Sequence, residues 1–393
     1  MNSQRKFHHR QIDRRSFLQN AGLAAGFVIA SGSSGSKVVS QDLQRRFAPV
    51  KVARDRVIRE VVGLRPYRDE GYVVEAQKLG NKLLIHNYGH GGAGITLSWG
   101  TASEAVELAR DFQLPASGRP TRRSVQRRFA VIGCGVNGLS TAILLQRRYQ
   151  DGPGTVTIYA KDLPPDTTSN IAGGYWMPTS LYDSASVTPK FIDRFKAAAH
   201  NSNRAFQLLV GPEYGVRWID VLELNRGRPS TTESLPGGND LYPNQFFYQD
   251  AEPRFGSPFV RQFSTMLIEP SKYLGVLLRD FYNAGGRLIV KEFRNRDEIM
   301  RLPESVIFNC SGLGAHLLFG DEKLVPARGQ LVVMLPQPEV DYCYVGPGYM
   351  FPRSDGIILG GTFDRGDWSL SVNPEQSTRI LNTHAAAMKG FKG

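Results

Sequence analysis

Three glycines near the middle of the chain have the spacing that brings a backbone close to a phosphate group. Gly133, Gly135 and Gly138 follow the apolar run 129–132 and precede the amphipathic stretch 139–148. The run is long enough for a buried parallel strand, and the stretch has one apolar face and a basic end, as helices often do. The order strand, GxGxxG turn and helix predicts a dinucleotide site at the helix N-terminus, whose free N–H groups favour phosphate. The alternative is a glycine turn needed only for helix–strand packing.

The strand after this helix offers one candidate for a ribose contact. Residues 155–159 consist of four β-branched residues and a tyrosine, which predicts the second parallel strand. An acidic residue is expected near the end of such a strand, where it binds the ribose hydroxyls. Lys161 stands at the convenient position and Asp162 follows one place later, so Asp162 is the candidate.

A second glycine-rich turn, 86–96, lies ahead of the first one in the chain. Its sequence, HNYGHGGAGIT, carries four glycines and leads into an apolar stretch, which is typical of a loop that enters a helix. The alternative reading is a loop whose glycines serve packing alone.

Several further segments resemble the D-amino-acid oxidase family. The segments that follow the GxGxxG turn are 166–178, 268–274, 306–312, 326–330 and 360–374. The last of them is similar to the fungal branch of the family. Residues 62–66 and 86–100 match as well, although the family carries these two near its C-terminus. The resemblance implies an α/β fold in which a Rossmann-like FAD-binding domain and a substrate domain with a mixed or antiparallel sheet are interleaved along the chain. It also implies FAD as the cofactor.

The swapped order of the two blocks predicts a circular permutation, with 113–128 as the joint between the old chain ends. Chain ends commonly lie close together on the surface, so such a rearrangement is physically cheap. The alternative is a gene fusion or a misassembly that brought in a stray fragment. Asn373 and Pro374 predict the start of a helix that ends near Lys389 and Gly390. The expected organisation lists eight segments: an export signal at 1–36, a permuted segment at 50–112, a basic linker at 113–128, the FAD-binding core at 129–180, substrate domain at 181–262, a return to the FAD domain at 263–318, substrate domain at 319–380 and a helix end at 381–393.

The resemblance assigns substrate-binding roles to four residues. Arg65 matches the arginine that binds the substrate carboxylate, a task suited to a guanidinium because it donates two parallel hydrogen bonds. Tyr349 matches a tyrosine that binds the same carboxylate, and the carbonyl of Gly92 matches the group that receives the amine. Tyr344 corresponds to a second, lid-like tyrosine of the mammalian branch, with a spacing one residue longer here. The alternatives are a surface arginine before a proline turn and aromatic packing beside a strand.

The resemblance also implies which residues hold the cofactor. The turn after the first strand and the segments that approach the phosphates and the flavin ring supply them: Gly133, Gly135, Val136, Asn137, Gly138, Asp162, Thr167, Thr168, Ser169, Gly173, Gly174, Gly91, Gly92, Gly94, Ile95 and Thr96. Glycines let backbone amides approach the ring, and a helix N-terminus stabilises the reduced anion. The implied reaction moves a hydride from the substrate Cα to flavin N5, after which the imino acid hydrolyses and oxygen is reduced to peroxide.

Charge and composition argue against other classes of protein. Of the net charge of +12, residues 1–36 contribute +4 and residues 113–128 contribute +5, so a signal and a linker explain the excess and nucleic-acid binding is not expected. The segment 13–19, DRRSFLQ, followed by a mild apolar stretch, resembles a bacterial twin-arginine export signal and predicts a periplasmic or secreted protein. A cytoplasmic protein with a basic tail is the alternative. The three cysteines and seven histidines show no metal spacing.

The expected partners are a small D-amino acid and oxygen, with transient membrane contact during export and a homodimer left open. Three competing functions stay open. An oxidase for D-aspartate or another amine would need an additional cation, for which Arg217 and Arg353 are candidates. A flavin dehydrogenase would pass electrons to a carrier instead of oxygen. A non-catalytic flavoprotein would oxidise no substrate.

Overall fold

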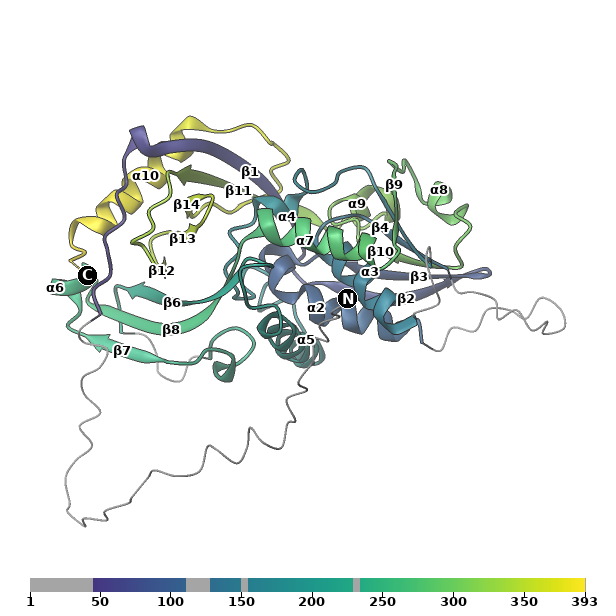
Figure 1. Cartoon of the computed structure of the whole chain (residues 1–393), viewed down its shortest axis with the longest axis horizontal. Coiled ribbons are helices and arrows are strands. Elements are labelled where there is room, and N and C mark those ends of the chain that lie inside the picture. Colours follow the sequence, from purple (N-terminus) through teal and green to yellow (C-terminus); the bar gives the residue numbers. More distant parts are fainter. Residues whose placement is uncertain (1–44, 111–127, 150–154, 229–233, 393) are drawn as a thin grey trace, which may run out of the picture. The chain divides into compact units, whose positions relative to one another are not determined.

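The computed structural model describes residues 45–110, 128–149, 155–228 and 234–392, which build two β-sheets and the helices packed on them (Figure 1). The smaller sheet has six strands in the order β2-β3-β10-β4-β5-β9. Their bounds are β2 Val73–Leu79, β3 Lys82–Tyr88, β4 Phe129–Ile132, β5 Val156–Ala160, β9 Arg287–Val290 and β10 Val306–Asn309. β2 is antiparallel to its neighbour and the other pairs are parallel. An α/β fold with a Rossmann-like sheet is thereby confirmed.

The parallel register brings several loops to one edge of this sheet. Ile132 at the end of β4 lies opposite Asn309 of β10 on one side and Tyr159 of β5 on the other. Asn309 in turn lies opposite His86 of β3. β4 consists of four buried apolar residues, as a strand covered on both faces requires. The two glycine-rich turns therefore begin at the same edge, although β3 and β4 lie far apart in sequence.

Helices α2 Gly94–Leu108 and α3 Val136–Tyr149 pack on the smaller sheet, and α5 Pro189–Gln207 and α7 Pro270–Asn283 pack on α2 and α3, respectively. α3 includes the predicted helix at 139–148 and starts three residues earlier. α5 begins at Pro189, and the side chain of Thr188 accepts a hydrogen bond from the Phe191 N–H, which satisfies one of the donors that a helix start leaves open.

The larger sheet has nine strands and runs in the order β1-β11-β14-β13-β12-β6-β8-β7, with β15 paired to β11. Its strands are β1 Val57–Tyr67, β6 Val216–Asn225, β7 Phe246–Gln249, β8 Phe259–Ile268, β11 Val325–Met334, β12 Tyr342–Val345, β13 Tyr349–Arg353, β14 Gly356–Gly360 and β15 Asp364–Arg365. All its pairs are antiparallel except β12 with β6. The substrate domain was expected to contain a mixed sheet of this kind.

The two faces of the larger sheet belong to different cores, because side chains alternate along a strand. Leu331, Phe351 and Ile358 join the cluster that also holds the interior of the smaller sheet. Met350 and Leu359, their neighbours along the strands, join a second cluster beneath α10 Pro374–Lys389. The site described below lies on the first of these faces.

Helix α10 has the boundaries that the sequence predicts. The Asn373 side chain accepts hydrogen bonds from the N–H groups of Glu375 and Gln376, Pro374 is the first helical residue, and Gly390 follows the last turn. The shorter helical elements are α4 Thr168–Ile171, α6 Glu252–Phe255, α8 Arg296–Met300, α9 Gly314–Phe319, η2 Arg54–Arg56, η3 Gly91–Ala93 and η4 Asn239–Leu241.

The N-terminal part of the described chain contributes to both sheets. β1 pairs with β11 along ten residue pairs, and β2 and β3 enter the smaller sheet beside β10 (Figure 1). The described residues from Arg46 onward group into one compact unit. The predicted signal at 1–36, and all of the predicted 113–128 linker except Arg128, lie outside the described residues. No helix among the residues described is long and apolar enough to cross a membrane.

Candidate active site

Arg65 and Tyr349 meet on the face of the larger sheet that turns toward the smaller one. Arg65 lies on β1 and Tyr349 on β13, with two strands between them. Nη2 of Arg65 donates to the Tyr349 hydroxyl oxygen at 3.2 Å, and Nη1 donates to the Thr362 carbonyl at 3.3 Å. Because the hydroxyl accepts from Arg65, its own proton is available to another acceptor. The sequence prediction that groups these two residues agrees with this geometry.

Two glycines on the strands between them allow the two side chains to converge. A Cβ added to Gly329 of β11 would lie 2.5 Å from Arg65 Nη2, and one added to Gly360 of β14 would lie 2.2 Å from the Tyr349 ring. Both side chains therefore lie flat over a glycine of a neighbouring strand. Sequence reasoning did not single out these glycines, because only the strand register reveals them.

The guanidinium of Arg65 is half-buried and has no carboxylate partner among the described residues. Its Cζ lies 5.6 Å from the centroid of the Phe363 ring, which shields one face. A partly desolvated cation that bonds only neutral oxygens is suited to bind a carboxylate from a ligand.

An aromatic stack begins at Tyr349. The rings of Tyr349 and Phe351 are 5.1 Å apart at 18°, and those of Phe351 and Tyr175 are 5.1 Å apart at 15°. Gly173 makes room for this stack, because a Cβ there would lie 2.5 Å from the Phe351 ring. Gly174, at φ 90°, accepts a hydrogen bond from Ile268 N at 2.7 Å and ties this segment to β8. The stack forms an apolar wall beside the Arg65–Tyr349 pair.

The GxGxxG turn has the close backbone contacts that its glycines allow. At Gly133, φ is 108°, and a Cβ would lie 2.5 Å from the Cys310 carbonyl; at Gly138 it would lie 2.0 Å from the Gly133 carbonyl. At Gly135 the nearest atom is the Ser169 hydroxyl, at 3.2 Å. The first and third glycines thus serve the turn and the helix contact, while the second leaves the backbone open to a ligand.

Polar side chains of α4 and its flanks lie beside this turn. The Ser169 hydroxyl accepts from Val136 N at 3.1 Å, at the start of α3. Thr167 is buried and donates to Asn170 Oδ1 at 2.8 Å, whereas Thr168 is exposed. Asp162 follows β5, and its carboxylate lies 3.8 Å from Lys161 Nζ on the surface. Ser169 is therefore the predicted hydroxyl residue in direct contact with the turn.

The second glycine-rich turn packs its backbone against residues 179–181. Gly92 N donates to the Ser180 carbonyl at 2.9 Å, and a Cβ at Gly91 would lie 2.3 Å from the same oxygen. Gly92 is exposed between buried neighbours, and the start of α2 at Gly94 has no side-chain cap. Ile95 and Thr96 are buried, and the Thr96 hydroxyl donates to the Ala93 carbonyl at 2.9 Å. The N-terminal N–H groups of α2 are the ones that a ligand can satisfy.

Buried polar side chains connect the two turns. Asn137 Oδ1 lies 3.5 Å from the Thr101 hydroxyl, which is 3.1 Å from His90 Nε2. Where the end of β10 lies opposite β3, His86 Nδ1 lies 3.0 Å from Asn309 Nδ2. Burial lowers the pKa of His86 to about 4 and that of His90 to about 3, so both are neutral near pH 7. Sequence reasoning missed these histidines, because only the fold shows their partners.

The structure does not bring Tyr344 to the site. Tyr344 pairs with Met350 and not with Tyr349, so its side chain lies on the opposite face of the sheet. It is fully buried in the second core cluster, where its hydroxyl is hydrogen-bonded to His384 Nδ1. The prediction of a lid-like tyrosine is corrected accordingly: the additional residue in the turn changes the face on which Tyr344 lies.

The two candidate cations for an acidic substrate side chain are already bonded to carboxylates. Arg217 Nη1 donates to Glu269 Oε1 at 2.8 Å, and Arg353 donates to both carboxylate oxygens of Asp355. Arg353 also donates to the Ala172 carbonyl at 2.9 Å. Both guanidinium groups therefore already have a carboxylate partner within the chain, whereas Arg65 has none among the described residues.

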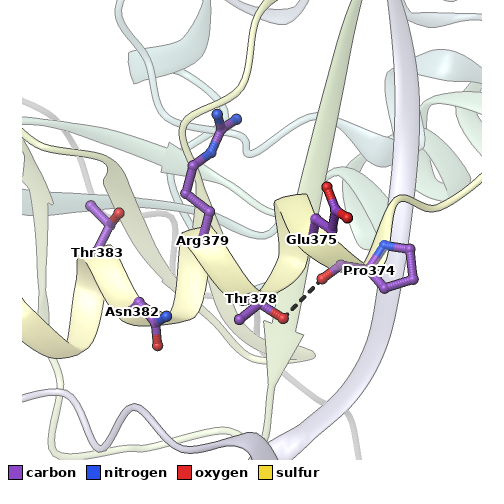
Figure 2. Close-up of a pocket in the computed structure, with 6 residues that line it drawn as sticks. All are labelled: Pro374, Glu375, Thr378, Arg379, Asn382 and Thr383. Carbon is purple, nitrogen blue, oxygen red and sulfur yellow. Dashed lines mark hydrogen bonds between the residues drawn. The ribbon is translucent and has the colours of Figure 1, made fainter.

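A separate depression of about 520 Å³ lies on the outer surface of α10 (Figure 2). Its lining residues all come from that helix: Pro374, Glu375, Thr378, Arg379, Asn382 and Thr383. The one hydrogen bond drawn there joins the Thr378 hydroxyl to the Pro374 carbonyl, as is common within a helix. This surface contains none of the residues of the site above, and no group of three metal-ligating side chains occurs in the part of the chain that the structure describes.

The chain belongs to the FAD dependent oxidoreductase family, whose sequence model matches residues 26–108 and 128–391. It is 30% identical to human D-aspartate oxidase over 276 residues, which cover 68% of this chain and 77% of that protein. It is also 30% identical to the D-amino-acid oxidase of Rubrobacter xylanophilus over 282 residues, 69% of this chain and 80% of that one. The glycine oxidase of Geobacillus kaustophilus superposes with a TM-score of 0.49 at 16% identity, covering 66% of this chain and 77% of that chain.

The residues present fit the FAD that this family uses. A Cβ at Gly135 would project into the space beside the turn, where it meets only the Ser169 hydroxyl, and the uncapped start of α2 lies at the same edge of the sheet as the start of α3. Gly135, Val136, Asn137 and Ser169 would hold the phosphates. Gly92 and Gly94, with the start of α2, would hold the ring system.

Proposed function

We propose that this chain is an FAD-dependent oxidase that deaminates D-amino acids. The observation that carries the proposal is the Arg65–Tyr349 pair, a cation without a carboxylate partner beside a hydroxyl with a proton to donate. Together they offer three donors to one carboxylate. The relatives named D-aspartate oxidase and D-amino-acid oxidase support this choice of substrate.

The residues of the chain bind and orient the substrate. Arg65 takes the carboxylate in two parallel hydrogen bonds, and the Tyr349 hydroxyl adds a third, which fixes the Cα relative to the sheet. The exposed Gly92 backbone offers a carbonyl to the substrate amine. The wall formed by Tyr349, Phe351 and Tyr175 excludes water from one side. When bound, FAD supplies the two-electron oxidation that proteins have no side chain to perform.

The reaction balances with oxygen as the oxidant. The D-amino acid loses two electrons and two protons to become an imino acid, which water converts to a 2-oxo acid and ammonia. Oxygen takes up the two electrons and two protons and becomes hydrogen peroxide.

Neutral D-amino acids suit the site better than D-aspartate does. A second substrate carboxylate needs a second cation, and Arg217 and Arg353 are both bonded to acidic side chains of the chain itself. Releasing either one would break an ion pair in which one side chain is buried, at a cost of a few kcal/mol. The aromatic wall favours an apolar substrate side chain.

The proposal is tested by oxygen uptake with a panel of D-amino acids, with the L-enantiomers as control. We expect uptake, peroxide and 2-oxo acid in equal amounts with neutral D-amino acids. Reduction of the flavin without oxygen uptake would favour a dehydrogenase that passes electrons to a carrier. Absence of flavin from the purified protein would favour a non-catalytic relative.

We also propose that the chain is a circular permutation of the family's usual order. Phe47 and Phe391, near the two ends of the described chain, pack on the same two rings, Tyr342 and Phe255. Val50 N lies 3.4 Å from Met388 Sδ beside them. The end of α10 therefore lies beside the segment before β1. A chain in the family's usual order could pass from one to the other through a short connection.

Export by the twin-arginine route is proposed from residues 13–19 alone. This route suits a flavoprotein, because the protein crosses the membrane already folded around its cofactor. Fusion of residues 1–36 to a reporter protein, with Arg14 and Arg15 replaced by lysine as the control, tests it. Cytoplasmic retention of both fusions would contradict the proposal.

A further inference from the structure

The back of the larger sheet, opposite the Arg65–Tyr349 pair, holds a buried histidine at one strand of the site. His384 lies on α10 and is 1% exposed. Its Nε2 lies 3.0 Å from the Gly360 carbonyl oxygen, and its Nδ1 is hydrogen-bonded to the Tyr344 hydroxyl. Gly360 is the cross-strand partner of Tyr349, whose ring lies over it on the front face. Gly360 is thus enclosed between Tyr349 in front and His384 behind.

The protonation state of His384 follows from its two partners. A carbonyl oxygen can only accept, so Nε2 must carry the hydrogen and donate it to Gly360. Nδ1 then has a lone pair that accepts the Tyr344 O–H. Burial lowers the pKa of His384 to about 4, so the neutral ring persists near pH 7 and each of its nitrogens is satisfied.

The same histidine also contacts the turn that carries Tyr349. A Cβ at Gly348 would lie 2.6 Å from His384 Nε2 and 2.7 Å from the Gly360 carbonyl. Gly346 N donates to the Gly348 carbonyl at 2.8 Å, which closes the tight turn between β12 and β13. Moving His384 would therefore affect both the strand under the Tyr349 ring and the residue just before Tyr349.

We propose that His384, held by Tyr344, is a positioning residue that fixes Tyr349 for binding of the substrate carboxylate. The inference rests on the proposed function. His384 does not touch the substrate and acts through Gly360 and Gly348. The exposed face of α10, which includes Asn382 and lines the depression in Figure 2, does not share this role.

The test compares two substitutions that each keep one of the two contacts. In His384→Gln the side-chain amide takes the place of Nε2–H and can still donate to Gly360, whereas in His384→Asn the shorter side chain reaches the position of Nδ1 and only the Tyr344 contact survives. We expect His384→Asn to raise KM for a neutral D-amino acid about fivefold, which corresponds to one net hydrogen bond, with kcat changed less than twofold. His384→Gln should be close to the wild type, as should the control Asn382→Ala. Equal KM values for the Gln and Asn variants would overturn the inference.

Coupling to Tyr349 separates positioning from a purely structural role. In a Tyr349→Phe background, His384→Asn should change KM less than twofold, because the hydroxyl that His384 positions is already gone. A full fivefold effect in that background would contradict the inference. Binding of acetate, followed through the flavin absorbance, should show the same pattern of dissociation constants. If the wild type oxidises no D-amino acid, the proposed function fails, and the acetate measurements alone then decide the role of His384.

Discussion

The guanidinium of Arg65 lies over Gly329 of the neighbouring strand, at the position where a β-carbon would stand. An added Cβ would be 2.5, 2.6 and 2.7 Å from Nη2, Nη1 and Cζ of Arg65. The backbone of Gly329 is an ordinary strand backbone paired with Gly63. A glycine is therefore needed at position 329 to leave room for the Arg65 side chain, and not because the strand backbone requires it.

Replacement of Gly329 by alanine should impair substrate binding and leave the fold intact. The methyl group would displace the guanidinium and break its contact with Tyr349, so we expect KM for neutral D-amino acids to rise tenfold or more, about 1.4 kcal/mol. Flavin content should not change. Gly275→Ala on α7 is the matched control, because a Cβ there meets nothing within 4 Å. Equal KM values for both variants would show that Arg65 does not bind the carboxylate.

The first two glycines of the GxGxxG turn should respond differently to alanine. At Gly133, with φ 108° and Cys310 O at 2.5 Å, a side chain strains the backbone and collides with it, so the apoprotein should lose roughly 1–3 kcal/mol of stability. At Gly135 a side chain meets only the Ser169 hydroxyl at 3.2 Å, so the apoprotein should change by less than about 0.5 kcal/mol. Both variants should lose FAD. Gly133→Ala distorts the tight turn that holds the pyrophosphate, and Gly135→Ala fills the space that the pyrophosphate needs.

Urea unfolding of the apoproteins and the ratio of flavin to protein separate these two effects. Retention of FAD by Gly135→Ala would mean that this backbone does not face the cofactor. An unchanged unfolding midpoint for Gly133→Ala would contradict the steric argument.

Much of the FAD side of the fold can be predicted from local sequence. The run 129–132 becomes β4 without a change of bounds, and Asn373 and Pro374 start α10 as their capping preferences require. These predictions succeed because strand burial, glycine turns and helix caps are encoded within about ten residues. The resemblance adds Arg65 and Tyr349, which the fold then brings to 3.2 Å.

What the sequence could not show depends on the register between distant strands. Gly329 and Gly360 make room for Arg65 and Tyr349 only because β1, β11, β14 and β13 are neighbours in one sheet. Tyr344 was wrongly expected in the site for the same reason. A strand alternates faces with every residue, so one additional residue in the β12–β13 turn places its ring in the opposite core.

Three buried histidines should make the protein less stable as the pH falls from 7 toward 4. Burial lowers the pKa of His86 and His384 to about 4 and that of His90 to about 3, from an ordinary value of 6.5. Between these pKa values the unfolded chain binds protons at histidines that stay neutral in the folded chain. The stabilising contribution of the neutral histidines is therefore fully present above pH 6.5 and is lost progressively as the pH falls below it. Each histidine contributes up to about 1.4 kcal/mol per pH unit in this window.

Urea midpoints at pH 7.0, 6.0 and 5.5 measure this dependence before most carboxylates titrate. His384→Gln should lower the slope by about one third, since one of three such groups is removed. His200 is the control: its pKa is raised by its hydrogen bond to the Lys196 carbonyl and by Asp240. Its contribution is present at low pH and is lost as the pH rises, so His200→Ala should not lower the slope. A pH-independent midpoint in the wild type would contradict the burial of the three rings.

The contact between the chain ends makes the permutation testable by reordering the chain. Phe47 lies 5.2 Å from the Tyr342 ring and Phe391 lies 5.6 Å from it, so a short linker can join residue 391 to residue 47. A chain that runs from 128 to 391 and then from 47 to 110 keeps every strand pair of both sheets. We expect it to fold, to bind FAD and to show kcat/KM within about threefold of the original order. As the control, the same linker placed after residue 130, within the central strand β4, should abolish folding, because β4 pairs with β10 and with β5 there. Two outcomes would contradict this expectation: a reordered chain that folds but does not bind FAD, or a reordered chain that does not fold. Either one would show that residues 111–127 are needed for more than the connection between 110 and 128.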